Sequence, residues 1–265
     1  MPQPAMNSSS PAFRAASAPY NLLALETSTE RLSLAIRLGD DAFVREVHAG
    51  QRHSELALPL MFELLAEAGA SLADMHAIAF GQGPGSFTGV RIACGLTQGL
   101  ALGLGKPVVP VQTQMALAQH CGAEKVIVAL DARMGEIYFA AYHRGDAASE
   151  RPGDGMWTLE AAPALVNPAA LPALCGDGWA AIGSAFDVPA LNEALRGKYD
   201  SQIERVVHHA LPSARDVAVI AARQLADSGI DSALPAGQAA PLYLRNNVAL
   251  TIVEREALRL KKAAA

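Results

Sequence analysis

Two short stretches of the sequence carry the small hydroxyl side chains and glycines with which protein loops hold phosphate. The first is ETSTER (26–31), a polar bend between two apolar runs. The second, GQGPGSFTG (81–89), leads from an apolar run to a helix N-terminus, where free N–H groups and the helix dipole favour an anion. An ordinary hairpin turn and a tight loop with positive φ are the alternatives. The candidate phosphate-binding residues are Thr27, Ser28, Gly83, Gly85 and Ser86.

Other patterns that indicate catalysis are missing from the sequence. The G-x-S-x-G elbow of serine hydrolases fails because two residues separate Ser86 from Gly89. The seven histidines contain neither H-E-x-x-H nor any pair four residues apart. Lys106 is followed by proline at a helix end, unlike the lysine of a P-loop. We therefore predict no catalytic residue and no metal site.

The composition is that of a globular protein with an acidic balance. Hydrophobic residues make up 51% of the 265 positions, enough for one sizeable core or two smaller ones. A net charge of -5 lacks the basic footprint of a protein that binds nucleic acid by itself. Three widely spaced cysteines predict buried, reduced thiols in a cytoplasmic protein. The longest nearly uncharged run, 92–105, is shorter than the roughly 20 residues of a membrane span, so we expect no transmembrane helix.

Hydrophobic periodicity predicts a mixed α/β order in the first half of the chain. A three-strand meander over 22–49 is followed by an amphipathic helix from His53 to Ala68, which either starts near Leu58 or contains Pro59 with a kink. Strands at 77–80 and 107–111 and helices at 88–104 and 113–122 follow. The order β-β-β-α-β-α-β-α predicts a mixed sheet covered by helices.

The second half opens with the same device as the first. An apolar run ends in an acid, Asp131, and a turn leads to an alternating strand, a duplication that is typical of two-lobed actin-like proteins. We expect irregular structure with one short helix or strand over 145–175, and a short strand within 179–186. A last helix over 213–228 starts at the capping residue Ser213. Residues 1–19 are expected to form a disordered tail and 246–265 a second tail.

A stripe of glycines lies inside the helix predicted over 88–104. Gly95, Gly99 and Gly103 recur every four residues, and each costs about 1 kcal/mol relative to alanine in a helix interior. Such a stripe allows another helix to approach closely. The pattern leaves two neighbours open, the chain's own helix over 56–68 or the helix of a partner.

Several strings together resemble the TsaB (YeaZ) family of the actin-like, peptidase M22 superfamily. They are LALETSTERLSLAI, HSELALPL, GQGPGSFTGVRIACGLTQGLALGLGKPVVPV and PLYLR. The likeness is dense over residues 21–143 and returns at 241–245. It implies an actin-like (ASKHA, ribonuclease H-like) α/β fold with subdomains at 20–118 and 119–245. Helix 213–228 is the element that could pack back on the first subdomain.

The resemblance also implies a function without catalysis by the chain itself. Members of the family pair with TsaD and activate it, and TsaD transfers the threonylcarbamoyl group of threonylcarbamoyl-AMP to the adenosine beside the anticodon of tRNA. The ATPase TsaE joins that complex, so ATP or ADP is expected there and not tightly bound here. A homodimer is expected without TsaD, tRNA is reached through the complex, and no membrane partner is implied. TsaD holds a metal with an H-x-x-x-H pair, for which Gln114 and Ala118 stand here.

In the family, the helices that follow HSE and GSFTG form the heterodimer, and they correspond to 54–68 and 88–104. The residues expected at the seam are Leu60, Leu64, Gly95 and Gly99. One departure from actin-like nucleotide binders is Glu26, which stands where they carry Asp. The rival interpretations are a peptidase of the M22 type and a stand-alone ATPase or sugar-kinase relative, whose adenosine-binding glycine would be Gly183.

Overall fold

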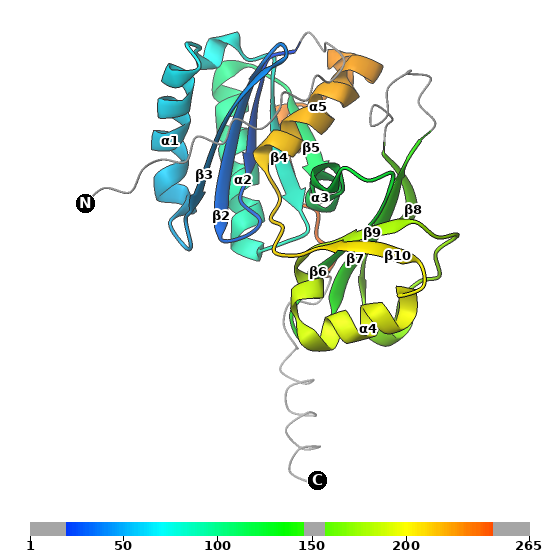
Figure 1. The fold of residues 1–265 in the computed structure, drawn as a ribbon. Coiled ribbons are helices and arrows are strands. Elements are labelled where there is room, and N and C mark those ends of the chain that lie inside the picture. The colour runs from blue at the N-terminus through cyan, green and yellow to red at the C-terminus, as the bar shows by residue number, and fades with distance from the viewer. Residues whose placement is uncertain (1–19, 146–156, 246–265) are drawn as a thin grey trace, which may run out of the picture.

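The computed structural model describes residues 20–145 and 157–245. They form two five-stranded mixed sheets with helices packed on them, and the sheets lie in two lobes (Figure 1). The tails expected at 1–19 and 246–265 lie outside the described residues.

The first sheet has the strand order β3-β2-β1-β4-β5. The first three strands form the predicted antiparallel meander, and the last two run parallel to β1. Their bounds are β1 Leu22–Glu26, β2 Arg31–Leu38, β3 Asp41–His48, β4 Ala77–Gly83 and β5 Val108–Gln112. The predicted order of elements up to residue 120 is confirmed.

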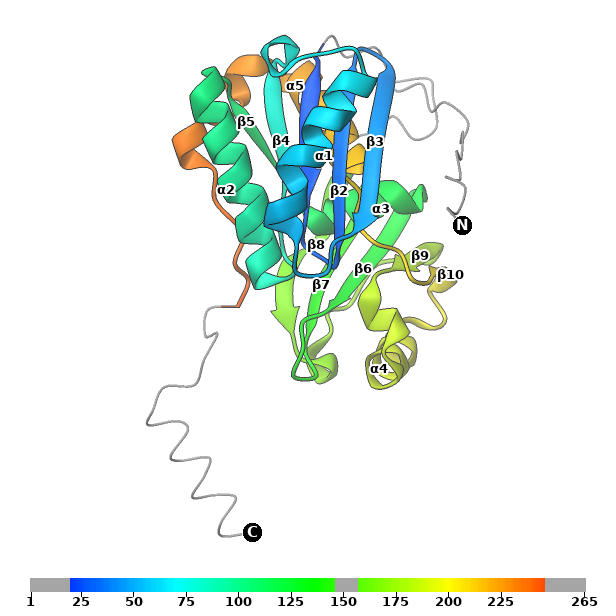
Figure 2. The same ribbon diagram turned by 90° about the vertical axis from the view of Figure 1, so that its left-hand side faces the viewer.

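Helices cover both faces of this sheet because side chains of β1 alternate between them. Leu23 and Leu25 pack with α1 (His53–Glu67) and α2 (Phe87–Leu104) (Figure 2). Leu22 and Ala24 pack on the other face with α5 (Ala214–Ser228), which returns from the second lobe. Of the two alternatives for α1, the structure has the helix that starts at His53 and contains Pro59.

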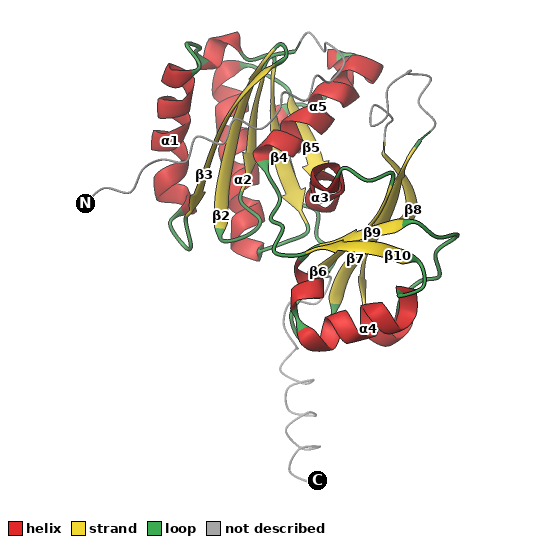
Figure 3. Cartoon of the chain, in the orientation of Figure 1, coloured by secondary structure: helices red, strands yellow, loops and turns green. Residues whose placement is uncertain are grey.

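The second sheet has the order β10-β9-β6-β7-β8, and α4 packs against it. Neither α4 nor β10 was expected, and β8 is a ten-residue strand where irregular structure with one short helix or strand was predicted (Figure 3). As an edge strand, β8 tolerates Pro163 and several alanines, which weaken the sequence signal. The bounds are β6 Lys125–Asp131, β7 Ile137–Arg144, β8 Trp157–Val166, β9 Trp179–Ile182, α4 Pro189–Tyr199 and β10 Ile203–Val207.

The helix α3 (Thr113–Cys121) lies where the two lobes meet. Ala116 packs in the core of the first sheet beside α5, whereas Leu117 and Ala118 pack with the second sheet. One helix therefore serves two cores, which fixes the lobes against each other.

The structure bears on two sequence expectations, the burial of the three cysteines and the absence of a transmembrane helix. Cys94 and Cys121 are buried as predicted, but Cys175 is exposed. Within the described residues, α2 is long and apolar enough to cross a membrane by length and composition. It packs along β4 as a layer of the first lobe, and this position accounts for the apolar residues on its buried side.

Candidate functional site

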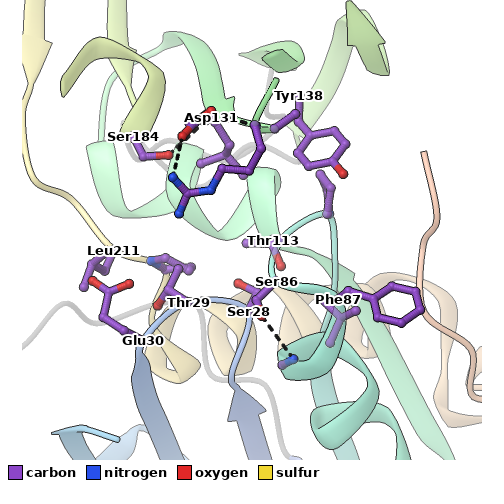
Figure 4. A pocket seen from close by; sticks show the side chains of 18 of the residues that line it. Ser28, Thr29, Glu30, Ser86, Phe87, Thr113, Asp131, Tyr138, Ser184 and Leu211 are labelled. Atoms are coloured by element: carbon purple, nitrogen blue, oxygen red, sulfur yellow. Dashed lines mark hydrogen bonds and ion pairs between the residues drawn. The ribbon is translucent and has the colours of Figure 1, made fainter. Parts of the chain in front are cut away.

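A cleft of about 1290 Å³ lies where elements of both lobes converge. The turn after β1 and the start of α2 line one side, and the turn after β6 lines the other (Figure 4). The crossing from β10 to α5 and the segment 242–245 complete the lining. This is the place where the two predicted phosphate loops meet.

The turn after β1 uses most of its polar groups inside the protein. Thr27 is fully buried, and its hydroxyl donates to the carbonyl of Gly89 at 2.7 Å. The backbone N–H of Ser28 donates to the carboxylate of Glu26 at 2.6 Å, and its carbonyl accepts from the N–H of Ser86 at 2.7 Å. Ser28 borders the cleft, but it is only 3% exposed and its hydroxyl oxygen is buried.

The glycine-rich loop packs tightly on that turn. A Cβ at Gly89 would overlap the carbonyl of Thr27, and one at Gly85 would press on Ser28. Gly83 has φ +101 and is buried away from the cleft lining, whereas Gly85 and Ser86 line the cleft. The hydroxyl of Ser86 caps α2 by accepting from the N–H of Gly89 at 3.4 Å. The structure thus brings the two loops together through contacts with each other, and phosphate binding stays a prediction.

Glu26 lies beneath both loops. Its side chain is 1% exposed and accepts hydrogen bonds from the N–H of Ser28 and from the hydroxyl of Thr113, the latter at 3.1 Å. Burial raises the pKa of Glu26 above its ordinary value, although these hydrogen bonds oppose the shift. Gly81 leaves the space for this carboxyl, because a Cβ there would overlap it. The chain's own acid therefore occupies donors that could otherwise face a bound anion.

The side of the cleft formed by the second lobe is built on the turn between β6 and β7. Asp131 accepts from the N–H of Arg133 at 2.8 Å and pairs with its guanidinium at 3.0 Å. Arg133 and Met134 have positive φ values of 67° and 58°, an uncommon conformation for residues other than glycine. Gly183 is needed for close packing, because a Cβ there would overlap the carbonyl of Ala129.

Gln114 and Ala118, which the resemblance sets in the place of the TsaD metal ligands, lie in the core. Gln114 is buried and donates to the carbonyl of Tyr138 at 3.1 Å, and Ala118 is buried in the core of the second sheet. Over residues 20–145 and 157–245, the structure groups no three His, Cys, Asp or Glu side chains in a way that could hold a metal ion.

The other candidate site is the outer face of α1 and α2. Gly95, Gly99 and Gly103 are exposed, and a Cβ at any of them would meet no described atom within 4 Å. The stripe therefore serves no close contact with the chain's own helix α1. Leu60 is partly buried against the core of the first sheet, and Leu64 is 0% exposed in that core, so the prediction of Leu64 as a seam residue is corrected.

Sequence reasoning missed the exposed large apolar side chains on the same two helices. Phe62 is 55% exposed and Leu58 is 38% exposed on α1, and Leu102 is 63% exposed on α2. Their signal in the sequence is weak but present, since Leu58 and Phe62 lie four residues apart and off the stripe that is buried. With the glycines they form what we call the α1/α2 face: Leu58, Phe62, Gly95, Gly99, Leu102 and Gly103.

The comparisons with known proteins agree with this architecture. Residues 46–253 match the family model described as TsaD, tRNA N6-adenosine threonylcarbamoyltransferase. The tRNA threonylcarbamoyladenosine biosynthesis protein TsaB of Escherichia coli is 36% identical over 237 residues, 86% of this chain and 96% of that protein. The chain belongs to the TsaB (YeaZ) family. The TsaB of Haemophilus influenzae is 44% identical over 134 residues, which cover 49% of this chain and 56% of that protein.

Solved structures place the chain in the same TsaB family. A Pseudomonas aeruginosa protein described as similar to the peptidase YEAZ superposes with a TM-score of 0.74 at 33% identity, over 85% of this chain and 100% of that one. The structure named YeaZ from Pseudomonas aeruginosa gives 0.70 at the same identity and coverage. The predicted family and the predicted actin-like α/β fold are confirmed.

Proposed function

We propose that this chain is the non-catalytic dimerisation partner and activator of TsaD in the formation of threonylcarbamoyladenosine next to the anticodon of tRNA. The observation that carries the proposal is the open glycine stripe of the α1/α2 face. The names of the TsaB relatives and the match to the TsaD family model support the pathway.

No contact among residues 20–145 and 157–245 explains the glycine stripe. Each of Gly95, Gly99 and Gly103 lies in open space, so alanine would fit and would favour the helix by about 1 kcal/mol. A helix of another chain can approach a glycine face more closely than any other helical surface. The exposed Phe62 of α1 and Leu102 of α2 are the kind of side chains that become anchors in protein interfaces. The face therefore fits a helical protein partner.

The cleft supports a role without tightly bound nucleotide. The N–H of Ser28 and the hydroxyl of Thr113 are held by Glu26, and the loop of Ser86 is held by the turn after β1. ATP or ADP then acts in the complex with TsaD and the ATPase TsaE. With a net charge of -5, the chain contacts tRNA through the complex, in the cytoplasm where tRNA is modified. Without TsaD, a second copy of the chain takes its place on the α1/α2 face.

The test is light scattering after size exclusion of the chain mixed with TsaD of its own organism, followed by a tRNA modification assay. We expect a heterodimer, and modification that depends on the chain. Gly99→Leu should weaken association by at least about tenfold, because a bulky side chain holds the partner helix away. Gly197→Leu is the matched control, since Gly197 is an exposed helical glycine of α4 with open space around it.

Two outcomes would contradict the proposal. The first is unchanged association of the Gly99→Leu variant, which would place the partner elsewhere. The second is failure of the wild-type chain to associate, together with peptide or ATP hydrolysis by the isolated chain, which would favour the enzyme alternatives.

A further inference from the structure

The segment that follows α5 runs along the first lobe and ends at the second (Figure 2). Leu234 pairs with Val108 at the start of β5 through two backbone hydrogen bonds of 2.8 and 2.9 Å. Ala236 is buried against α2. The N–H of Leu242 then donates to the carbonyl of Gln82 at 2.7 Å, beside the glycine-rich loop. We call residues 241–245 the strap.

One end of the strap is attached to the first turn of α2. The rings of Tyr243 and Phe87 lie 5.9 Å apart, and the guanidinium of Arg91 lies 3.7 Å from the centre of the Phe87 ring. Nε of Arg91 also donates to the hydroxyl of Tyr243 at 2.6 Å. These contacts combine a charge-assisted hydrogen bond with a cation–π contact.

Phe87 and Arg91, which hold Tyr243, belong to the same exposed row of α2 as the glycine stripe. Residues four apart lie near one another on a helix surface, and every fourth residue from the first turn onward is exposed: Phe87, Arg91, Gly95, Gly99 and Gly103. This row turns gradually around the helix and Gly95 lies one turn from Arg91, so a partner helix that covers Gly95 adjoins the residues that hold Tyr243.

The other end of the strap is attached to the second lobe. Arg245 forms an ion pair of 2.7 Å with Glu136 and donates to the carbonyl of Ala132 at 3.1 Å. Both bonds reach the turn between β6 and β7, which lines the cleft opposite Ser86. The two side chains of the pair are 18% and 30% exposed, so water screens them less than a fully exposed pair.

We propose that the strap couples the partner face of α2 to the cleft, so that a partner bound on α2 changes the mobility of the turn between β6 and β7. The chain of contacts is continuous from Arg91 and Phe87 through Tyr243 and Arg245 to Glu136. This inference rests on the proposed function for the identity of the partner. It adds that binding on one face regulates the cleft between the lobes.

The test is hydrogen exchange read by mass spectrometry, with and without TsaD. In the wild-type complex we expect slower exchange over 87–104 and also over 131–137. Arg245→Gln and Glu136→Gln, which break the pair from opposite ends, should keep the first effect and reduce the second by about threefold or more. Arg196→Gln is the control, because Arg196 forms an exposed ion pair with Asp200 in the same lobe. Equal protection of 131–137 in all variants, or none in the wild-type complex, would overturn the coupling.

A second arm uses the isolated chain and separates this inference from the proposed function. The strap predicts that Arg245→Gln speeds exchange over 83–91 as well as over 131–137, since both ends lose a shared tether. A change confined to 131–137 would overturn the coupling even if TsaD binds. Absence of a complex with TsaD would refute the proposed function, and the isolated chain would still decide whether the strap joins the two sites.

Discussion

At the scale of single residues, Glu26 shows what the sequence can and cannot reveal. The sequence marks it as an acid at a hairpin bend, and its neighbours Thr27 and Ser28 suggest phosphate. The structure adds Thr113, which is 87 residues away, as a hydrogen-bond donor to the same carboxyl. A contact between residues so far apart leaves no local pattern. The sequence therefore predicts the bend and its acid, but it does not predict that the acid is hydrogen-bonded inside the protein.

The pH dependence of stability should carry a signature of Glu26. Its pKa is raised in the folded state by burial, so the native protein holds the proton more tightly than the unfolded chain. The contribution to the free energy of unfolding is largest below the ordinary pKa of 4.5 and is lost as pH rises through the folded pKa. Glu26→Gln should therefore be more stable than wild type at pH 7, with a difference that shrinks toward pH 4. Denaturant unfolding across this range checks it, and a difference that is constant with pH would contradict it.

The three thiols should differ in reactivity. Cys94 and Cys121 are buried and burial raises the pKa of both, whereas Cys175 is exposed. A thiol reagent should modify one cysteine about tenfold or more faster than the other two, because a buried thiol reacts only after local opening. Cys175→Ser is the control and should remove the fast phase. Three equal rates would show that the cores around α2 and α3 open readily.

At the scale of elements, α2 contains glycines of two kinds. Gly89 is required by the fold because Thr27 lies against it, whereas Gly99 faces open space. The bounds of this helix follow from local signals, a capping serine and a C-terminal glycine in the left-handed conformation, and were predictable. Which of its faces is covered depends on α1 and the sheet, and the sequence left that open. Leu64 is a different case: the periodicity of helix 53–68 puts it on the apolar stripe and Phe62 off it, and its expected place at the seam came from the resemblance alone.

Alanine substitutions should separate the two kinds of glycine. Gly99→Ala should raise the free energy of unfolding of the isolated chain by about 1 kcal/mol, since it favours the helix and meets no neighbour. Gly89→Ala should lower it by about 1–3 kcal/mol, because the methyl group overlaps a backbone carbonyl. Thermal and denaturant unfolding of both variants are the measurement. Destabilisation by Gly99→Ala would mean that the stripe is packed within the chain.

At the scale of the whole molecule, the two lobes are joined by α3, by the crossing from β10 to α5, and by the strap. Arg31 of β2 holds the second of these, donating to the carbonyls of Leu211 at 2.6 Å and Pro212 at 2.9 Å. The sequence predicted two sheets from the repeated hairpin. The return of helix 213–228 to the first lobe was anticipated, but the hydrogen bonds that hold the crossing were not, because they join residues about 180 positions apart.

Removal of Arg31 should loosen this crossing. Arg31→Ala should lower the free energy of unfolding by about 2 kcal/mol, as expected for charge-assisted hydrogen bonds to partly buried carbonyls. Arg45→Ala is the matched control on the neighbouring strand, because Arg45 pairs with Glu63 and Glu67 on the surface and should cost less than about 1 kcal/mol. Equal costs for the two variants would contradict the role of Arg31.

The open glycine stripe also has a consequence for the amount of this protein in a cell. Three helical glycines in open space leave the isolated chain about 3 kcal/mol less stable than an alanine version. A deficit of 1–2 kcal/mol is enough to change steady-state abundance several-fold through proteolysis of unfolded molecules, and a bound partner restores the loss by mass action. Under the proposed function, cellular quality control would thus remove copies made in excess of the partner, and matched subunit numbers would follow without transcriptional control.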